Sequence, residues 1–412
     1  MRRRFTIQKA QTFDSSNYLT IEALEDNLTV TFTKDIEYGI DGKNWITLNA
    51  GNETQPINIG QTLSFRGELS PNNSNGIGTF TINKKCNLKG NCMSMLFGDN
   101  AVNNYSLSGK NYAFYKLFYK CKNIVNVDSN FLPATTLANS CYRYMFSGCS
   151  SLKKAPKLPA TTLADSCYES MFGGCSILTT APELPATTLA NSCYSYMFSG
   201  CMKFVNAPKL PATTLADYCY SYMFNMCALT TAPELPATTL AKYCYESMFS
   251  SCSLKKAPKL PATTLANSCY DHMFMNNSWL TTAPKLPATT LAVGCYAYMF
   301  YGCGRLKTAP ELPATTLVNL CYRNMFYACE SLTTAPELPA ITLAKYCYES
   351  MFERCTKLNY IKMLATNISA SGCLDQWTYR VSSTGTFVKN ASMTSLPTGT
   401  SGIPSGWAVQ NA

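Results

Sequence analysis

The segment Leu-Pro-Ala-Thr-Thr-Leu recurs nine times along this 412-residue chain, almost without change. Successive copies lie 25 or 26 residues apart. A fixed period of this size predicts a solenoid, because one unit is too small to bury its apolar side alone and must stack on its neighbours. The copies begin at Leu132, Leu158, Leu184, Leu210, Leu235, Leu260, Leu286, Leu312 and Leu338.

Within a unit, the residue order favours short strands and turns over helices. Pro156 and Pro159 exclude a long helix through that stretch, and 26 residues cannot also hold a helical hairpin. We therefore expect a short strand at 152–158 and at most one helical turn at 142–146. Stacked coils would advance by about 4.8 Å each, the spacing of paired strands. The prolines remove ladder hydrogen bonds, so the strand should be short and irregular.

Residues 1–85 differ in character from the repeats and predict an Ig-like β-sandwich head. Short alternating runs lie at 28–33, 36–40, 45–48, 62–65 and 78–82, separated by turn sequences that suggest antiparallel hairpins. Residues 86–131 look like two degenerate capping coils, 132–373 form the regular array, and 374–412 are expected to cap its far end. The predicted fold is mainly β, with about twelve coils between head and cap.

Composition indicates a folded chain and limits its partners. Hydrophobic residues make up 46% and charged residues 14%. The net charge of +10 is thinly spread, with no Lys/Arg run beyond residues 2–4, so we expect no nucleic-acid binding. No run of about 18 apolar residues is present, and nothing is expected to span a membrane. Residues 2–4 imitate the start of a signal peptide, but no apolar segment follows, so ordinary secretion is not expected.

The run Met145-Phe146-Ser147-Gly148-Cys149-Ser150-Ser151-Leu152 carries a Met-Phe-x-x-Cys-x-x-Leu pattern that recurs through the array. This pattern resembles the core of BspA-like leucine-rich repeats, which are common in proteins of gut and oral bacteria and their phages. The resemblance covers roughly residues 92–373. It implies a leucine-rich-repeat fold and a role in adhesion or binding, with no catalytic motif to carry over. The unit here is longer and contains an inserted Pro-Ala-Thr-Thr.

The 21 cysteines form two ladders, one before each core Tyr and one eight residues later, as at Cys141 and Cys149. No Cys-x-x-Cys pair exists and the chain has one His, which argues against zinc. Parallel side chains in identical rotamers seldom meet disulfide geometry. Asn277 replaces one of the cysteines, which also argues against a ladder of disulfides. We expect buried free thiols, no metal and no other cofactor. The Tyr after each first Cys should be half-buried with its hydroxyl at the rim.

Two pairs of positions change freely from unit to unit: the pair after Cys-Tyr and the pair after Met-Phe. We expect both on one outer side of the array, where aromatics beside Asn and Asp suit glycan stacking or a protein partner. His272 beside Asp271 is one variant of the first pair, and the motif supplies no third orienting group or oxyanion site for catalysis. The candidate ligand-binding residues are Tyr144, Tyr196, Tyr222, Asp271, His272, Asn276, Trp279, Tyr298 and Tyr301.

The residue before most repeat leucines is charged, and its sign often alternates between units. Opposite charges on adjacent coils are expected to pair, each exposed pair contributing about 0.2–1 kcal/mol. A solvated face kept in register by charge is favoured over a sugar- or protein-binding stripe. The row consists of Lys157, Glu183, Lys209, Glu234, Lys259, Lys285, Glu311 and Glu337.

These features predict a non-enzymatic binding or structural protein. A phage or prophage virion component (a tail fibre, host-recognition or decoration protein) assembled in the host cytoplasm would fit both the thiols and the missing export signal. The alternative is a secreted BspA-like adhesin on the bacterial cell surface. A glycan hydrolase would need two carboxylates facing each other across a groove, and Glu169 and Glu246 do not identify such a pair. The expected partner is a host-cell surface glycan or protein, or another virion protein, and a homo-oligomer is left open.

Overall fold

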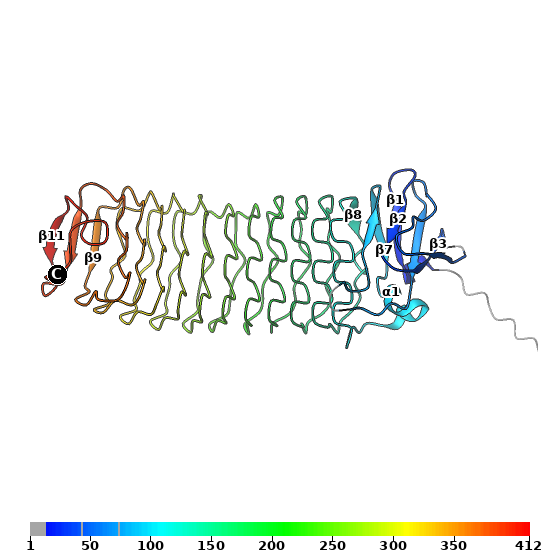
Figure 1. The fold of residues 1–412 in the computed structure, drawn as a ribbon, viewed down its shortest axis with the longest axis horizontal. Coiled ribbons are helices and arrows are strands. Elements are labelled where there is room, and N and C mark those ends of the chain that lie inside the picture. The colour runs from blue at the N-terminus through cyan, green and yellow to red at the C-terminus, as the bar shows by residue number, and fades with distance from the viewer. Residues whose placement is uncertain (1–13, 43, 73–74) are drawn as a thin grey trace, which may run out of the picture.

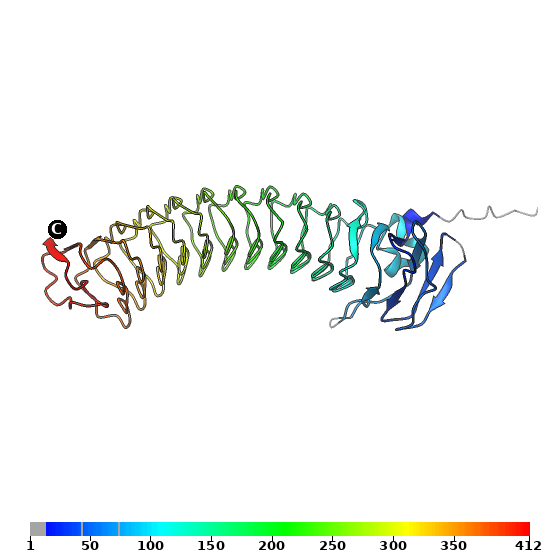
Figure 2. The same ribbon diagram turned by 90° about the horizontal axis from the view of Figure 1, so that it is seen from above.

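The computed structural model describes residues 14–42, 44–72 and 75–412. The protein is elongated: a strand-rich head at one end leads into a long row of coils, and a small sheet lies at the C-terminal end (Figure 1). Viewed from above, the row of coils bends into a shallow arch (Figure 2). The basic segment 2–4, which imitates the start of a signal peptide, lies outside the described residues.

Short strands build the head: β1 (Leu19–Ala23), β2 (Val30–Phe32), β3 (Ile36–Ile40), β4 (Ile46–Leu48), β5 (Thr62–Arg66), β6 (Phe80–Ile82), β7 (Cys86–Gly90) and β8 (Ile124–Val127). Six of them form a sheet with the order β4-β3-β5-β1-β7-β8, and β2 pairs with β6 in a second sheet. Phe80 on β6 packs against Phe65 on β5, with ring centroids 5.1 Å apart, so the two sheets share an apolar interior. The helical segments are short: Ser15–Asn17, α1 (Ser94–Phe97) and Gly98–Asn103.

The alternating runs predicted as strands correspond to β2 through β6. The sequence reading missed β1, although its residues Leu-Thr-Ile-Glu-Ala alternate between apolar and polar. The strand lies in the middle of the sheet, where the polar Thr20 is buried together with Leu19 and Ile21. The sheet also continues past residue 85, since β7 pairs antiparallel with β1 and parallel with β8. Phe80 stacks on Phe118 at 5.3 Å, so the head interior runs directly into the core of the coils.

Each repeat contains a series of consecutive turns where one helical turn was expected, and in the unit 138–149 no helix forms. The N–H groups of Cys141, Arg143 and Met145 donate to carbonyls three residues back at 3.1–3.2 Å. The N–H groups of the alternating residues point to the next coil, as from Tyr142 to the Cys167 carbonyl at 3.0 Å. Because the donors divide between the two directions, this stretch forms a continuous ladder from coil to coil without regular strands.

Two columns of stacked rings fill the interior of the coils. Tyr142 and Tyr168 are parallel with centroids 5.8 Å apart, and Phe146 and Phe172 repeat this arrangement at 5.8 Å. The expectation of half-buried tyrosines is wrong, because Tyr142 and Tyr168 are each only 1% exposed. Their hydroxyl groups have no hydrogen-bond partner among the described residues, and burial raises the pKa of both well above the ordinary value. Neighbouring coils cover both ring faces, which a single repeat cannot reveal.

The 21 cysteines are free and buried. In the second ladder they act as hydrogen-bond donors as well as small apolar groups: Cys175 Sγ lies 3.2 Å from the Phe146 carbonyl of the preceding coil. Asn277 occupies the same place and donates through Nδ2 to the Phe249 carbonyl at 2.7 Å. The substitution is tolerated because the amide performs the thiol's role.

The opposite side of the array, which we call the proline side (the segments equivalent to 153–161 in each unit), is held by single-residue contacts. Parallel bridges join Lys154 to Thr180 and Thr180 to Asn206, and similar bridges recur at 25 or 26 residues. The strand expected at 152–158 therefore shrinks to one bridged residue, since Pro156 and Pro159 have no N–H to donate. Of the predicted mainly β fold, the structure confirms short strands joined by coil and the period of about 26 residues.

The charged row on the proline side is less paired than expected. Among the described residues, only Glu337 forms an ion pair along this row, at 3.1 Å from Lys362 of the following coil. The other alternating neighbours lie beyond ion-pair distance. Exposed lysine and glutamate side chains lose conformational entropy when they are held together, which offsets the small Coulomb gain in water.

The C-terminal segment covers the last coil. Three parallel strands, β9 (Tyr360–Met363), β10 (Thr386–Lys389) and β11 (Ala408–Asn411), form its sheet in the order β11-β10-β9. Trp377 is fully buried at the end of both ring columns, 6.4 Å from Tyr348 and 6.1 Å from Phe352. Its indole N–H donates to the Gly402 carbonyl at 2.9 Å, which fixes the ring over the last coil.

Candidate binding surface on the turn side of the repeats

The two freely varying pairs lie on the side of the coils that carries the consecutive turns. In the first pair the second residue, such as Tyr144 or His272, has a positive φ of 56–57°. This left-handed conformation costs an L-residue roughly 1–2 kcal/mol. It is held by the ladder, since the Tyr144 N–H donates to the Glu169 carbonyl at 2.9 Å. The backbone at this position is thus constant while the side chain can vary. We call the first variable pair of all units the first row and the second variable pair the second row.

The structure brings several candidate rings together in pairs on adjacent coils. Tyr196 stacks on Tyr222 with centroids 4.5 Å apart, and Tyr196 remains 40% exposed. His272 stacks on Tyr298 at 4.3 Å. In the second row Tyr301 stacks on Tyr327 at 4.4 Å, a partner absent from the candidate set. Stacking covers one face of each ring and holds the pair rigid, so that binding costs little side-chain entropy.

Tyr144 belongs to a different cluster at the head end of the row. Its ring lies edge-on to Tyr115 and Tyr119, at 6.1 and 6.4 Å. The Lys116 ammonium lies 5.0–5.8 Å from the centres of these three rings. Comparing the repeat units with one another did not reveal this cluster, because Tyr115 and Tyr119 belong to a degenerate opening coil that departs from the repeat pattern.

A polar network connects the centre of the first row. Ser221 Oγ donates to Glu246 at 3.0 Å, and Asp271 Oδ1 lies 2.6 Å from His272 Nδ1. Burial raises the pKa of Glu246, and the nearby Asp271 charge adds to this effect against the lowering hydrogen bond from Ser221. Near the two ends of the row Arg143 pairs with Glu169, and Arg323 pairs with Glu349. The surface therefore offers rings, carboxylates and guanidinium groups in fixed positions.

Asn276 and Trp279 lie beside this row. Asn276 is exposed, with a φ of 58°. Trp279 is 48% exposed on the corner that follows the turns, and Arg305 lies over its ring at 3.9 Å. The indole therefore already has a cation on one face, leaving its other exposed atoms to contact a partner.

A shallow recess of about 310 Å³ lies between Tyr119 and Tyr196, and residues of both variable pairs line it. Ser170, Gly173 and Gly174 line it, and Gly173 occupies a position where the other repeats carry a larger residue. The Gly173-Gly174 dipeptide was the sequence signal for this recess, and the sequence reasoning missed it. A recess this small suits one protruding side chain of a partner.

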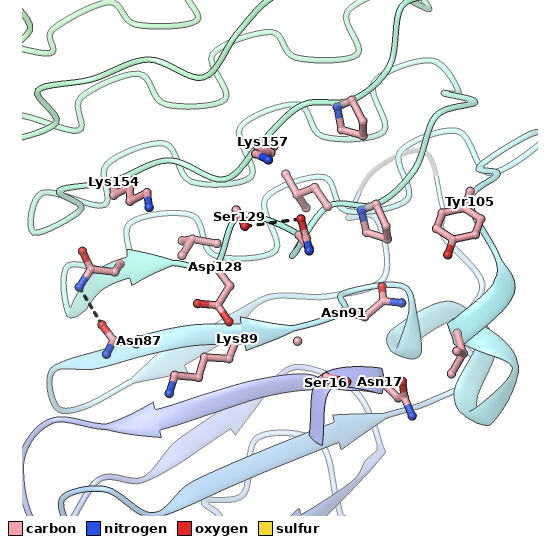
Figure 3. Close-up of a pocket in the computed structure, with 18 residues that line it drawn as sticks. Ser16, Asn17, Asn87, Lys89, Asn91, Tyr105, Asp128, Ser129, Lys154 and Lys157 are labelled. Carbon is pink, nitrogen blue, oxygen red and sulfur yellow. Dashed lines mark hydrogen bonds between the residues drawn. The ribbon is translucent and has the colours of Figure 1, made fainter. Parts of the chain in front are cut away.

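A larger depression, of about 980 Å³, lies where the head meets the first coils (Figure 3). Lys89, Lys154 and Lys157 line it together with Asp128 and Tyr105. Its charge is partly compensated, because Lys89 pairs with Glu22 at 2.6 Å and Asp128 adds a carboxylate. Asn126 donates to Asn87 at 3.0 Å along its wall. The residues that line this depression come from positions between 16 and 159, so no short sequence motif could have predicted it.

Within the described ranges, no group of three or more His, Cys, Asp or Glu side chains is arranged to hold a metal ion. No helix in the same part of the chain is long and apolar enough to cross a membrane. The prediction that the chain needs no cofactor stays a prediction.

A family model of the BspA type leucine rich repeat region matches six copies within residues 108–203, 139–281 and 267–376. The chain belongs to the BspA-type leucine-rich repeat family. The resemblance inferred from the Met-Phe-x-x-Cys-x-x-Leu pattern is thereby confirmed. BspA-type repeat proteins are generally non-catalytic and are typically linked to surface binding, and leucine-rich repeat proteins bind proteins. No curated protein and no solved structure matches the chain.

Proposed function

We propose that this BspA-type repeat protein is a non-enzymatic adhesin whose repeats form a solenoid, and that its turn side binds a partner protein at a cell surface. The observation that carries the proposal is the row of rigid ring pairs and charged groups at the positions that vary between otherwise constant repeats. Tyrosine and arginine are enriched among the residues that dominate protein interfaces.

The shape of the surface favours a protein over a small molecule. The row runs along adjacent coils, and its recess of about 310 Å³ is too shallow to enclose a ligand. Tyr196 with Tyr222 and His272 with Tyr298 form two separate anchors. Glu246, on the coil between those anchors, and Asp271, beside His272, supply acceptors. A long, nearly flat array of this kind matches an extended contact area.

The test compares binding by wild type and by two double variants. Tyr196→Ala with Tyr222→Ala removes one anchor, whereas Tyr218→Ala with Tyr243→Ala removes a stacked pair at 4.6 Å that lies outside the two variable pairs. Binding to host cells and to immobilised surface proteins should fall at least tenfold for the first variant and stay near wild type for the second. Equal binding by both variants would move the site elsewhere, and loss of binding only on glycan arrays would identify a sugar as the ligand.

The bacterial cell surface is the proposed location, because the family is linked to surface binding. The role in a phage virion stays a prediction, which phage structural genes beside the coding sequence would support. Labelling of intact bacteria with an antibody to the protein tests the cell-surface proposal directly.

A further inference from the structure

The charged row on the proline side continues into the C-terminal sheet. Leu338 is bridged to Met363, which places Lys362 at the position that Glu337 occupies one coil earlier. From Lys157 to Lys259 the signs alternate, but two lysines then stand on adjacent coils and two glutamates follow. The order over the last six positions is Glu234, Lys259, Lys285, Glu311, Glu337 and Lys362.

The break in alternation coincides with two grooves. Lys255, Lys256, Lys259 and Lys285 surround a groove of about 860 Å³ whose walls include alanines and prolines such as Pro258 and Pro284. Glu311 and Glu337 border a smaller groove of about 360 Å³, also lined by prolines. The molecule thus carries a cationic and an anionic apolar groove close together on one side.

Charge alternation within the chain does not explain this arrangement. Like charges opposite each other on neighbouring strands are destabilising, so Lys259 beside Lys285 works against the stacking of its own coils. In the described part of the chain, Lys255, Lys256, Lys259, Lys285 and Glu311 all lack an ion-pair partner, while Glu337 has Lys362. The four lysines and both glutamates are exposed, so all but the paired Glu337 are free to meet charges outside the chain.

We propose that two copies of this chain associate in antiparallel orientation through the proline side. A two-fold axis between the coils of Lys285 and Glu311 places Lys285 opposite the second copy's Glu311, and Lys259 opposite its Glu337. The same operation places Glu234 opposite Lys362. Each of the six positions therefore meets one opposite charge, and the two-fold axis makes each of the three residue pairs occur twice in the dimer.

The order of charges favours a second copy over an unrelated partner. An anionic ligand would match the cationic groove and would be repelled by the adjoining anionic one. Only a surface with the reversed order complements both grooves, and this chain carries that surface itself. The proline and alanine walls supply apolar contact, while the charges set register and orientation. This interface leaves the turn side free and does not depend on the proposed adhesive function.

The test is sedimentation analysis of the full chain and of charge-reversal variants. The acidic variant carries Lys259→Glu and Lys285→Glu, and the basic variant carries Glu311→Lys and Glu337→Lys. The control, Lys122→Glu with Lys203→Glu, makes the same charge change as the acidic variant at exposed positions away from the six-residue row. Circular dichroism and the melting temperature establish that each variant is folded.

Wild type and control should dimerise, with a dissociation constant that rises at least tenfold between about 50 and about 500 mM salt. The acidic and basic variants should each be monomeric alone and form a 1:1 dimer when mixed, since the mixture restores every opposite-charge pair. A wild type that stays monomeric up to about 100 µM at low salt would overturn the proposal. So would folded variants that dimerise alone, or a mixture of them that does not associate.

Discussion

Replacing Asn277 with alanine should destabilise the array by about 2–4 kcal/mol, because it removes three hydrogen bonds at a fully buried position. Asn277 Nδ2 donates to the Phe249 carbonyl at 2.7 Å and to the Phe274 carbonyl at 3.0 Å. Its Oδ1 accepts from the Leu254 N–H at 3.2 Å. Each buried hydrogen bond contributes about 0.5–1.5 kcal/mol, and the groups left behind have no access to water.

The acceptor role of Asn277 has a local cause in the preceding coil. In 26-residue units such as that of Leu178, the leucine N–H donates to the carbonyl of the cysteine three residues back, at 3.0 Å. The unit of Leu254 is one residue shorter between Cys252 and the leucine, so that turn cannot form. Asn277→Cys keeps one donor but loses the acceptor, and should cost about 1–2 kcal/mol.

Denaturant unfolding followed by circular dichroism would measure these differences as shifts of the midpoint. Cys175→Ala is the matched control, because it removes a single thiol-to-carbonyl contact at 3.2 Å and should cost about 1 kcal/mol. The expected order of stability is wild type, then Asn277→Cys, then Asn277→Ala. If Asn277→Ala unfolds at the same midpoint as Cys175→Ala, the hydrogen-bond explanation is wrong.

Three further predictions concern the thiols and the C-terminal segment. The 21 cysteines should react with a thiol reagent only after denaturation, and without prior reduction; oxidation of more than half would contradict the buried-thiol account. Burial raises the pKa of Cys175 from 9.0 to about 12. The buried thiol therefore contributes fully to stability below pH 9, and this contribution should be lost as the pH rises from 9 towards 12. A melting temperature that falls over this pH range would show the loss. Deleting residues 374–412 removes Trp377 and exposes the rings of Tyr348 and Phe352, so the truncated chain should aggregate. A soluble truncation with an unchanged melting temperature would show that this segment does not act as a cap.

The sequence by itself determined the repeat period, the buried Met-Phe and Cys positions, most head strands and the side on which variable residues are displayed. These properties follow from patterns within one unit or from comparison of units, and both are visible in a linear chain. Tyr196, Tyr222, His272 and Tyr298 were found in this way, and the structure places them in stacked pairs. Their role in binding stays a prediction.

Only the tertiary structure decided how the coils join. The turn ladder, the complete burial of Tyr142 and the donor role of Cys175 depend on groups about 26 residues away, whose distance and direction no single unit specifies. The same holds for the central place of β1 in its sheet, because that place depends on its pairing with β5 on one side and β7 on the other. Proline side chains prevented the expected strand because they remove donors at the positions where a ladder would need them, so contacts between coils, not propensities within them, set the final backbone.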